Sequence, residues 1–294
     1  MRSRWLLNLA LLLAVVGIAL FLHLRPAPKV ESGPEVFAVS SVAAADIRHI
    51  QIEFPAKAAV ELEKRDNRWF LIKPYAARAG AAPVEQILAI LAGVTNEKFP
   101  ATDLARFGLD QPQFRLRLDR EEFSFGTINP LDGRQYVAHR DAVYLLPSRF
   151  AESANIQVVE LLDKRPLAME EEIAGFDFSR LEQWVPTGLK VDITPDGWRV
   201  SIPEAKPVKQ ELDSWFADEW RPLTATSVEP YRPNSREQHP SFVVKLKNGK
   251  TIRFDKLLES PELQLARPDE GMIYHFPQDA GFVILNPPIG YRPK

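Results

Sequence analysis

The sequence of 294 residues contains no cysteine. This absence excludes a disulfide scaffold, a cysteine-ligated zinc site, an iron–sulfur cluster and a thiol nucleophile. The sequence also has no large excess of either charge. It contains 37 Lys and Arg residues and 39 Asp and Glu residues, which gives a formal net charge of -2. Such a chain lacks the basic surface that nucleic-acid binding usually requires, so we expect no nucleic-acid partner. With 45% hydrophobic and 26% charged residues, it has the composition of a folded globular protein.

Motifs for catalysis and cofactor binding are missing as well. Neither G-x-G-x-x-G nor G-x-S-x-G occurs, which removes the dinucleotide-binding and nucleophile-elbow signatures. Gly249-Lys250-Thr251 resembles the end of a phosphate-binding loop, but Val244 stands where that loop needs its first glycine. None of the five histidines has metal-ligand spacing: His23, His49, His139, His239 and His275. We therefore predict a non-enzymatic protein with no catalytic residue, no cofactor and no metal site.

One long apolar run stands out, Trp5–Leu24, which contains no Lys, Arg, Asp or Glu. A helix of this length rises about 30 Å, the thickness of a bilayer core. Arg2 and Arg4 precede the run, and no small-residue cleavage site follows it closely. We therefore predict an uncleaved single-pass anchor in the cytoplasmic (inner) membrane. The alternatives are a cleaved signal peptide and a buried core helix.

The orientation of this anchor is less clearly encoded. Arg25 and Lys29 follow the run, so the basic residues on its two sides are nearly balanced. We place the N-terminus in the cytoplasm and the later domains in the periplasm, because a signal-like start before one long polar region usually exports that region. The interval 25–41 contains four Pro or Gly residues and is predicted to be a Pro-rich linker.

Alternating apolar residues predict strands from Ile47 onwards. A helix is predicted from Pro83, with an apolar face that runs from Val84 to Val94. Asn248-Gly249 lies between two alternating runs and predicts a hairpin with a type I′ turn. A short helical turn before Gly108 predicts that this glycine is a left-handed C-terminal cap. The charge run Glu170–Glu172 is predicted to be solvated.

Several landmarks recur in the same order about 129 residues apart. The recurring pairs are Trp69 and Trp198, Pro112-Gln113-Phe114 and Pro240-Ser241-Phe242, and Tyr144 and Tyr274. We therefore predict an α+β protein: a single N-terminal transmembrane helix followed by two tandem copies of a mostly antiparallel β-sheet plus helix unit. The predicted domains are the cytoplasmic N-terminus and anchor 1–24, the linker 25–41, the first unit 42–157, a linker 158–171, the second, diverged unit 172–288 and the tail 289–294.

The first unit resembles a known family, domain of unknown function 4340 (DUF4340). The residues that carry the resemblance are Asp46–Ile50, Trp69–Pro74, the helix from Pro83, Phe107–Pro112, Phe125-Gly126, Asn129-Pro130, Tyr136-Val137 and Val143-Tyr144. Nothing in the second unit matches Phe107-Gly108-Leu109-Asp110 well. The resemblance implies a bacterial, membrane-anchored envelope protein, and some relatives look like auxiliary parts of transport systems. It implies no catalytic residues.

Two groups of residues are candidates for an interaction site. Gly126, Asn129, Asp132 and Tyr136 are predicted at the rim of a pocket in the first unit, around a loop with turn chemistry. Trp215, Phe216 and Trp220 are predicted on the second helix. One bulky apolar stripe of that helix, formed by Val208, Leu212, Trp215 and Phe216, belongs to the core or contacts a partner or the other unit.

From these features we expect a membrane-tethered, non-enzymatic envelope interaction protein that serves as an auxiliary component of a transport system. Its partners would be the cytoplasmic membrane, through residues 5–24, and other envelope proteins. The alternative is an extracytoplasmic ligand-binding module that takes a small ligand, a glycan or lipid fragment.

Overall fold

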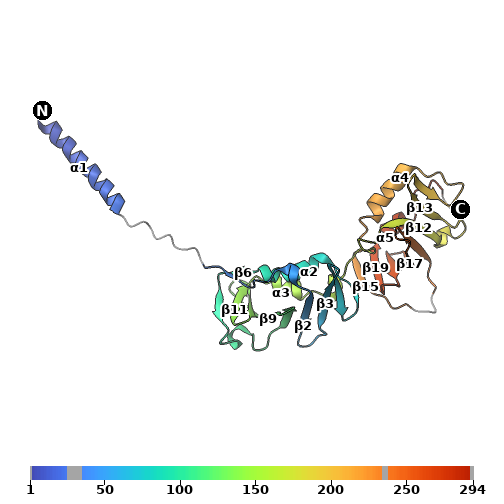
Figure 1. The fold of residues 1–294 in the computed structure, drawn as a ribbon, viewed down its shortest axis with the longest axis horizontal. Coiled ribbons are helices and arrows are strands. Elements are labelled where there is room, and N and C mark those ends of the chain that lie inside the picture. The colour runs from blue at the N-terminus through green and yellow to red at the C-terminus, as the bar shows by residue number, and fades with distance from the viewer. Residues whose placement is uncertain (1, 25–34, 234–237, 292–294) are drawn as a thin grey trace. The chain divides into compact units, whose positions relative to one another are not determined.

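The computed structural model describes residues 2–24, 35–233 and 238–291. The chain divides into two compact units, Met1–Phe37 and Ala38–Lys294. The first contains helix α1 (Arg2–Leu24), and the side chains described along it are exposed (Figure 1). Among the residues that could be searched, no helix is both long and apolar enough to cross a bilayer. Residues 25–34 of the predicted linker and 292–294 of the predicted tail lie outside the described residues.

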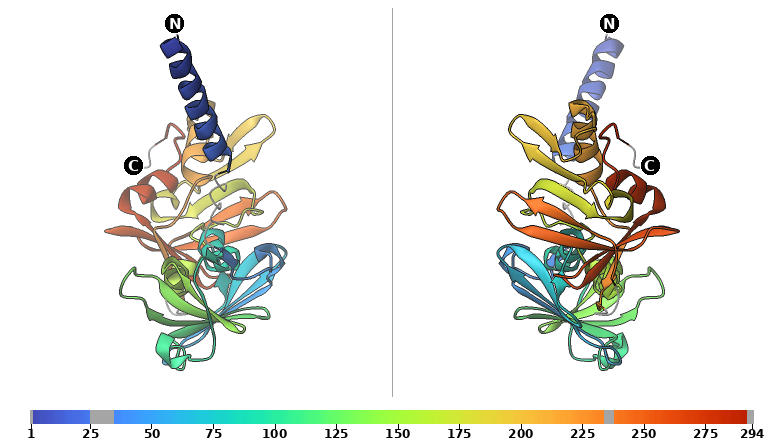
Figure 2. Two further views of the ribbon diagram at one scale, coloured as in Figure 1. Left: turned by 90° about the vertical axis from the view of Figure 1, so that its left-hand side faces the viewer. Right: turned by 90° about the vertical axis from the view of Figure 1, so that its right-hand side faces the viewer.

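The unit Ala38–Lys294 contains two large antiparallel sheets, which confirms the α+β class. The first sheet has the strand order β5-β4-β3-β2-β8-β9-β10-β11-β7. Its strands are β2 (His49–Glu53), β3 (Val60–Arg65), β4 (Arg68–Lys73), β5 (Ala77–Arg78), β7 (Lys98–Pro100), β8 (Phe114–Leu118), β9 (Glu121–Ile128), β10 (Gln135–His139) and β11 (Ala142–Leu146). Short strands β1 (Phe37–Ala38) and β6 (Val94–Thr95) lie outside this sheet. Figure 2 shows the twist of the strands.

The second sheet has the order β14-β13-β12-β16-β17-β18-β19-β15. If the strands of each sheet are counted in chain order, leaving out the extra edge strand β5 of the first sheet, the two sheets have the same spatial strand order. Trp69 and Trp198 then lie in the matching strands β4 and β14, and Tyr144 and Tyr274 in β11 and β19. The strands are β12 (Ile173–Arg180), β13 (Lys190–Thr194), β14 (Gly197–Val200), β15 (Ser227–Pro230), β16 (Ser241–Leu246), β17 (Thr251–Leu258), β18 (Glu262–Arg267) and β19 (Met272–Pro277).

The predicted hairpin between β16 and β17 is present, but the predicted turn type is wrong. Only Gly249 has a positive φ, 81°, whereas a type I′ turn needs positive φ at both central residues. The N–H of Gly249 donates to the carbonyl of Leu246, and the N–H of Leu246 donates to Lys250. These bonds define a three-residue loop, a type I turn closed by a left-handed glycine. The side-chain oxygen of Asn248 accepts a hydrogen bond from the N–H of Lys250, which stabilises this three-residue loop.

A turn with two positive φ values occurs instead between β3 and β4. Asp66 and Asn67 have φ of 46° and 62°, and Arg65 pairs directly with Arg68. Gly108 also has the predicted left-handed conformation, with φ of 65° at the end of the 3₁₀ turn η3 (Ala105–Phe107).

The helices lie between strands or follow the last strand of each sheet (Figure 1). They are α2 (Ala81–Leu88), α3 (Arg149–Ala154), α4 (Lys209–Ser214) and α5 (Gln278–Ile284), with short turns η1 (Ala44–Asp46), η2 (Ala89–Ala92), η4 (Val158–Leu161) and η5 (Glu182–Trp184). α4 continues into a π-helical turn, η6 (Trp215–Trp220).

Two residues predicted to lie on the apolar faces of helices do not do so. Val94 is exposed in β6 because the extended Gly93 ends the helix, and Val208 is exposed because α4 begins only after it.

The core of the second sheet is aromatic. Phe176 of β12 stacks on Phe178, and its ring centroid lies 4.6 Å from that of Trp220 and 5.1 Å from that of Trp215. Four rings are thus packed against one another over β12, and their burial holds η6 against the sheet.

Three tryptophan side chains form hydrogen bonds to the end of α5. The Nε1–H groups of Trp215, Trp220 and Trp184 donate to the consecutive carbonyls of Val283, Ile284 and Leu285. The last carbonyls of a helix have no partner within the helix, so these three bonds satisfy groups that burial would otherwise penalise.

Candidate functional site

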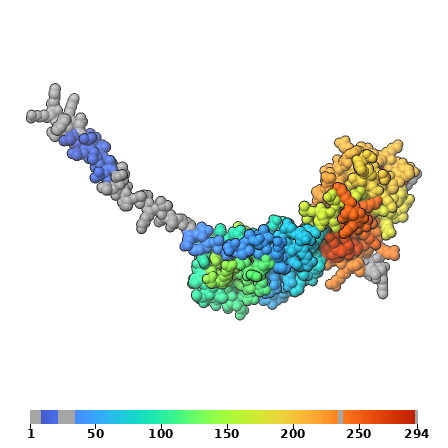
Figure 3. Space-filling view, in the orientation of Figure 1, coloured from blue at the N-terminus to red at the C-terminus, as the bar shows by residue number. Residues whose placement is uncertain are grey.

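The candidate site is centred on residues 163–172, here called the junction segment, which connects the parts of the chain that form the two sheets. It begins beside the edge strand β5, where the N–H of Asp163 donates to the carbonyl of Arg78. It ends at β12, where the carbonyl of Glu172 accepts from Lys247. The segment therefore contacts both sheets. Figure 3 shows side chains of the first half, coloured blue to cyan, in contact with orange and red atoms of the second.

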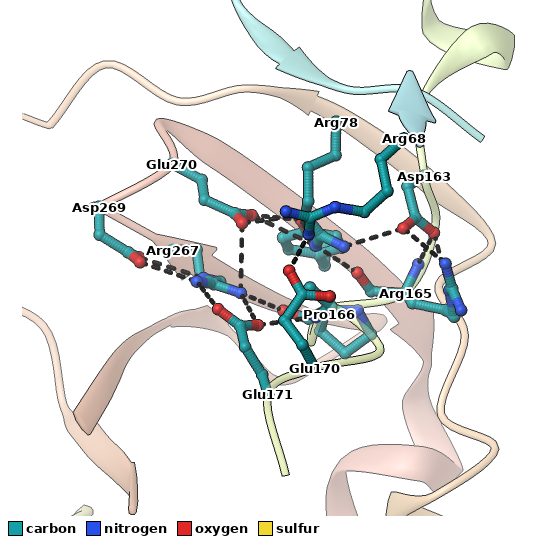
Figure 4. A network of polar contacts seen from close by, with 12 residues as sticks. Arg68, Arg78, Asp163, Arg165, Pro166, Glu170, Glu171, Arg267, Asp269 and Glu270 are labelled. Atoms are coloured by element: carbon teal, nitrogen blue, oxygen red, sulfur yellow. Dashed lines mark hydrogen bonds and ion pairs between the residues drawn. The ribbon is translucent and has the colours of Figure 1, made fainter. Parts of the chain in front are cut away.

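Arg78 links the first sheet to the second through a guanidinium that is largely shielded from solvent, with its side chain 12% exposed (Figure 4). Its Nε donates to Oε1 of Glu270 at 2.9 Å, and its Nη2 donates to the hydroxyl of Tyr274 at 2.8 Å. Nη1 donates to Oδ2 of Asp163 at 2.9 Å, and Nη2 also donates to the carbonyl of Arg165 at 2.6 Å. Every nitrogen of this guanidinium is thus bonded, and its partners come from the junction segment and from the β18–β19 hairpin.

Arg267 is the second cation of the network, and its side chain is buried, only 3% exposed, at the end of β18. It donates to both oxygens of Glu171, at 2.9 and 3.0 Å, and to both oxygens of Asp269, at 3.1 and 2.8 Å. Its Nη1 also donates to the carbonyl of Pro166 at 2.8 Å. Two bidentate contacts of this kind fix both the position and the orientation of the guanidinium.

The pKa shifts in this network follow from burial and pairing. Burial alone would lower the pKa of Arg267, but hydrogen bonds to Asp269 and Glu171 raise it above its usual value. Burial alone would raise the pKa of Glu171, yet its bonds from Arg267 and from the N–H of Ala168 lower that pKa. Burial raises the pKa of Tyr274. At neutral pH Arg267 and Glu171 are therefore charged, and Tyr274 is neutral.

The prediction that Glu170–Glu172 is a solvated charge run is wrong for Glu171. Its side chain is 19% exposed because it pairs with Arg267, whereas Glu170 and Glu172 are exposed and pair with Arg68 and Lys247. Residues 168–171 form a turn, in which the N–H of Glu171 donates to the carbonyl of Ala168 and the N–H of Ala168 donates to the carboxylate of Glu171. These bonds direct the side chain of Glu171 toward Arg267.

Replacing Glu171 by glutamine is expected to destabilise the protein in a pH-dependent way. Because the folded state lowers the pKa of Glu171, its contribution is present above the usual value of 4.5 and is lost as pH falls through the folded pKa. At pH 7 we expect E171Q to lose about 1.5–3 kcal/mol, the range for hydrogen bonds to charged groups.

Urea unfolding of both proteins at pH 7, 5, 4 and 3 measures this effect. The difference in free energy of unfolding should narrow below pH 4.5. A difference that stays constant down to pH 3 would show that Glu171 does not act through its charge.

A cavity of about 400 Å³, here called the larger cavity, opens on one side of the junction segment. Its apolar wall is formed by Ile193 of β13, by Phe216 and Trp220 of η6, and by Met169 of the junction segment. Charged groups at its edge are Arg165, Glu171, Glu172, Arg221 and Lys247. An apolar hollow with a few charged groups at its edge is the usual form of a binding site.

A smaller cavity of about 180 Å³ lies on the other side of the same segment. It is lined from the first sheet by Arg68, Trp69 and Phe70 and shares Arg165, Ala168 and Met169 with the larger cavity. Met169 is 79% exposed and belongs to both linings. An exposed methionine is adaptable and is common on binding surfaces.

The structure places the first group of predicted site residues away from these cavities. Gly126 is buried in β9, where its carbonyl accepts from Gln135. Asn129 and Asp132 stabilise the β9–β10 loop, through bonds to the N–H of Leu131 and to Arg134. Tyr136 in β10 packs on the rings of Phe99 and Phe107. These four residues have structural contacts in their own half of the protein.

Gly126 is required by a close backbone approach. An added Cβ would lie 2.2 Å from the carbonyl oxygen of Phe107 and 2.9 Å from Cγ of Leu109. We expect G126A to lower the free energy of unfolding by about 1–3 kcal/mol, the usual cost of overpacking. Chemical denaturation is the measurement, with Ser124→Ala on the same strand as the control, expected within about 0.5 kcal/mol of the natural protein. Equal stability of the two variants would contradict this account.

The second predicted group is divided between core and cavity. Trp215 is buried on Phe176 and serves the core. Phe216 is half-buried and lines the larger cavity, and the buried Trp220 also forms part of its wall. The residues that sequence reasoning missed are Arg78, Arg267 and Met169, since their roles depend on segments that are far apart in the sequence.

Histidine–carboxylate pairs form a separate cluster at the β8–β9 turn. Nδ1 of His49 lies 3.2 Å from Oδ1 of Asp119, and Nε2 of the buried His139 lies 3.0 Å from Oε2 of Glu121, without hydrogen-bond geometry. The hydroxyl of Ser40 donates to Glu121 rather than to a histidine, which is not the order of a catalytic triad. Within the residues that could be searched, no group of three or more His, Asp or Glu side chains is placed to hold a metal ion.

The fold and the site define a two-sheet antiparallel α+β protein whose halves are joined by a partly buried ion-pair network. The family model described as Domain of unknown function (DUF4340) matches residues 69–260. The chain therefore belongs to this family, and the match extends into the second sheet, beyond the residues that carry the resemblance in the first. Neither a curated protein nor a solved structure matches the chain significantly.

Proposed function

We propose that this chain is a membrane-tethered, non-enzymatic envelope protein that binds a partner protein beside the junction segment. Tethering rests on the apolar run Trp5–Leu24, which we infer to be a single-pass anchor in the cytoplasmic membrane, with its N-terminus in the cytoplasm and the unit Ala38–Lys294 in the periplasm. We infer further that the two sheets are tandem copies of one unit. The family resemblance supports an auxiliary role in a transport system.

The observation that carries the proposal is the pair of cavities on the two sides of one rigid segment. Arg78 and Arg267 hold that segment through hydrogen bonds at both ends, so the cavity walls are fixed before a partner arrives. A preformed surface loses little conformational entropy on binding. Met169 is the exposed group between the two cavities, where a partner would contact it.

Site-specific photo-crosslinking in native membranes tests this proposal. A photoreactive diazirine residue replaces Met169 in the full chain, and a matched chain carries it at the exposed Gln86 of α2. The expected result is one dominant protein adduct from position 169 and none from position 86. Transporter subunits in that adduct would support the auxiliary role. Absence of any protein adduct from position 169 would contradict the proposal.

A second candidate is a binding module for a glycan or lipid fragment. The larger cavity favours it, because its volume of about 400 Å³ falls within the range of small-molecule sites. Bound ligand raises stability by mass action, so a thermal-shift screen with glycan and lipid fragments should then show a rise in Tm. A lipid or glycan adduct at position 169 in place of a protein would also favour this function.

A further inference from the structure

Among the charged groups of the larger cavity, Arg221 differs from the others. Arg165 donates to both oxygens of Asp163, and Lys247 donates to Glu172 at 2.7 Å. The carboxylate of Glu171 is held by Arg267. Within residues 35–233 and 238–291, Arg221 forms no ion pair with a carboxylate. The cavity edge therefore carries one positive charge that is not compensated by a neighbouring side chain.

The π-helical turn η6 puts Arg221 at the cavity. The N–H of Arg221 donates to the carbonyl of Phe216, five residues earlier, at 3.1 Å. In an α-helix, residues five apart point in different directions, because one turn takes about 3.6 residues. The wider turn brings the Arg221 guanidinium 5.0 Å from the centroid of the Phe216 ring. Single π-helical turns of this kind are frequent at functional sites.

The cation–π contact holds the guanidinium without neutralising it. A guanidinium stacked on an aromatic face keeps its N–H donors available at its edge. These donors match the two oxygens of a carboxylate. Directly beside them, Phe216, Trp220 and Ile193 form the apolar wall of the cavity. The site thus offers an apolar hollow and a carboxylate-binding group next to each other.

We propose that the larger cavity takes a bulky apolar side chain of the partner protein, and that Arg221 pairs with an Asp or Glu close to that side chain in the partner sequence. This inference rests on the proposed function and names the recognition chemistry of the same site. A buried apolar anchor beside a charge pair is a common form of interface hot spot.

Charge reversal in the crosslinking experiment tests the proposal. The full chain carries the photoreactive residue at position 169, with Arg221→Glu in one variant and Arg149→Glu in its control. Arg149 is a matched control because it is also exposed and lies 4.9 Å from the centroid of a neighbouring ring, that of Phe150, away from both cavities. We expect R221E to reduce capture on the order of ten-fold and R149E to leave it unchanged.

Mapping of the crosslinked partner peptide supplies the second readout. It should contain a bulky apolar residue with an Asp or Glu within about three positions. Replacing that acid by lysine in the partner should restore capture by R221E.

Three outcomes would overturn the inference: full capture by R221E, a mapped segment without an acid, or failure of the lysine exchange to restore capture. In each of these the natural chain still captures its partner, so the proposed function survives. If the natural chain captured no protein, both this inference and the proposed function would be contradicted. A lipid adduct would favour the second candidate function instead.

Discussion

Replacing Arg267 by alanine is expected to lower the free energy of unfolding by about 3–5 kcal/mol, the usual cost of breaking a buried ion pair from one side. The cation is 3% exposed and bonds Glu171, Asp269 and the carbonyl of Pro166. Its removal leaves the carboxylates of Glu171 and Asp269 close together without the cation that donates hydrogen bonds to both. Urea unfolding followed by circular dichroism at pH 7 measures the loss.

An exposed arginine in the first sheet provides the control. Arg115 in β8 pairs with Glu122, and the side chains of the two residues are 49% and 45% exposed. Arg115→Ala should therefore cost only about 0–1 kcal/mol. If R267A were as stable as R115A, the network would contribute nothing to folding, and the argument for a rigid junction segment would fail with it.

Replacing Trp220 by alanine is expected to cost about 3–5 kcal/mol, the range for removal of a large aromatic side chain from a core. Its ring lies 4.6 Å from that of Phe176 and 5.9 Å from that of Phe242, measured between centroids. The substitution also removes the Nε1–H donor to the carbonyl of Ile284. The same denaturation experiment measures the change.

Trp220→Phe separates packing from hydrogen bonding. Phenylalanine keeps an aromatic ring but is smaller and lacks the indole donor, so we expect a cost of about 1–3 kcal/mol for the unpaired carbonyl and the lost ring contacts. A cost for W220F equal to that for W220A would mean that the indole bond, and not the ring packing, holds η6 on the sheet.

Local patterns predicted most of the secondary structure, because a strand with one buried face records its environment in alternate residues. Ile50 and Ile52 of β2 are buried, as are Phe123 and Phe125 of β9. Turn chemistry was less informative. Asn248-Gly249 fits two hairpin loops, and the choice between them depends on how β16 and β17 are paired.

The candidate site was only partly predictable. The aromatic residues of η6 are recognisable from the sequence because they are large and close together along the chain. Arg78 and Glu270 are separated by 192 positions, and neither has a local pattern that distinguishes it from a solvated charge. The same holds for Met169, whose exposure depends on the path of the junction segment. Such contacts are set by tertiary structure alone.

The indole bonds to the end of α5 also set an order of events during synthesis. The three donors belong to residues 184–220, and their acceptors follow them along the chain by 64 to 101 positions. A ribosome therefore exposes the tryptophans well before Val283, Ile284 and Leu285. Until those residues emerge, the aromatic core of the second half stays incomplete and open to chaperones, whereas the strands of the first half have already been made.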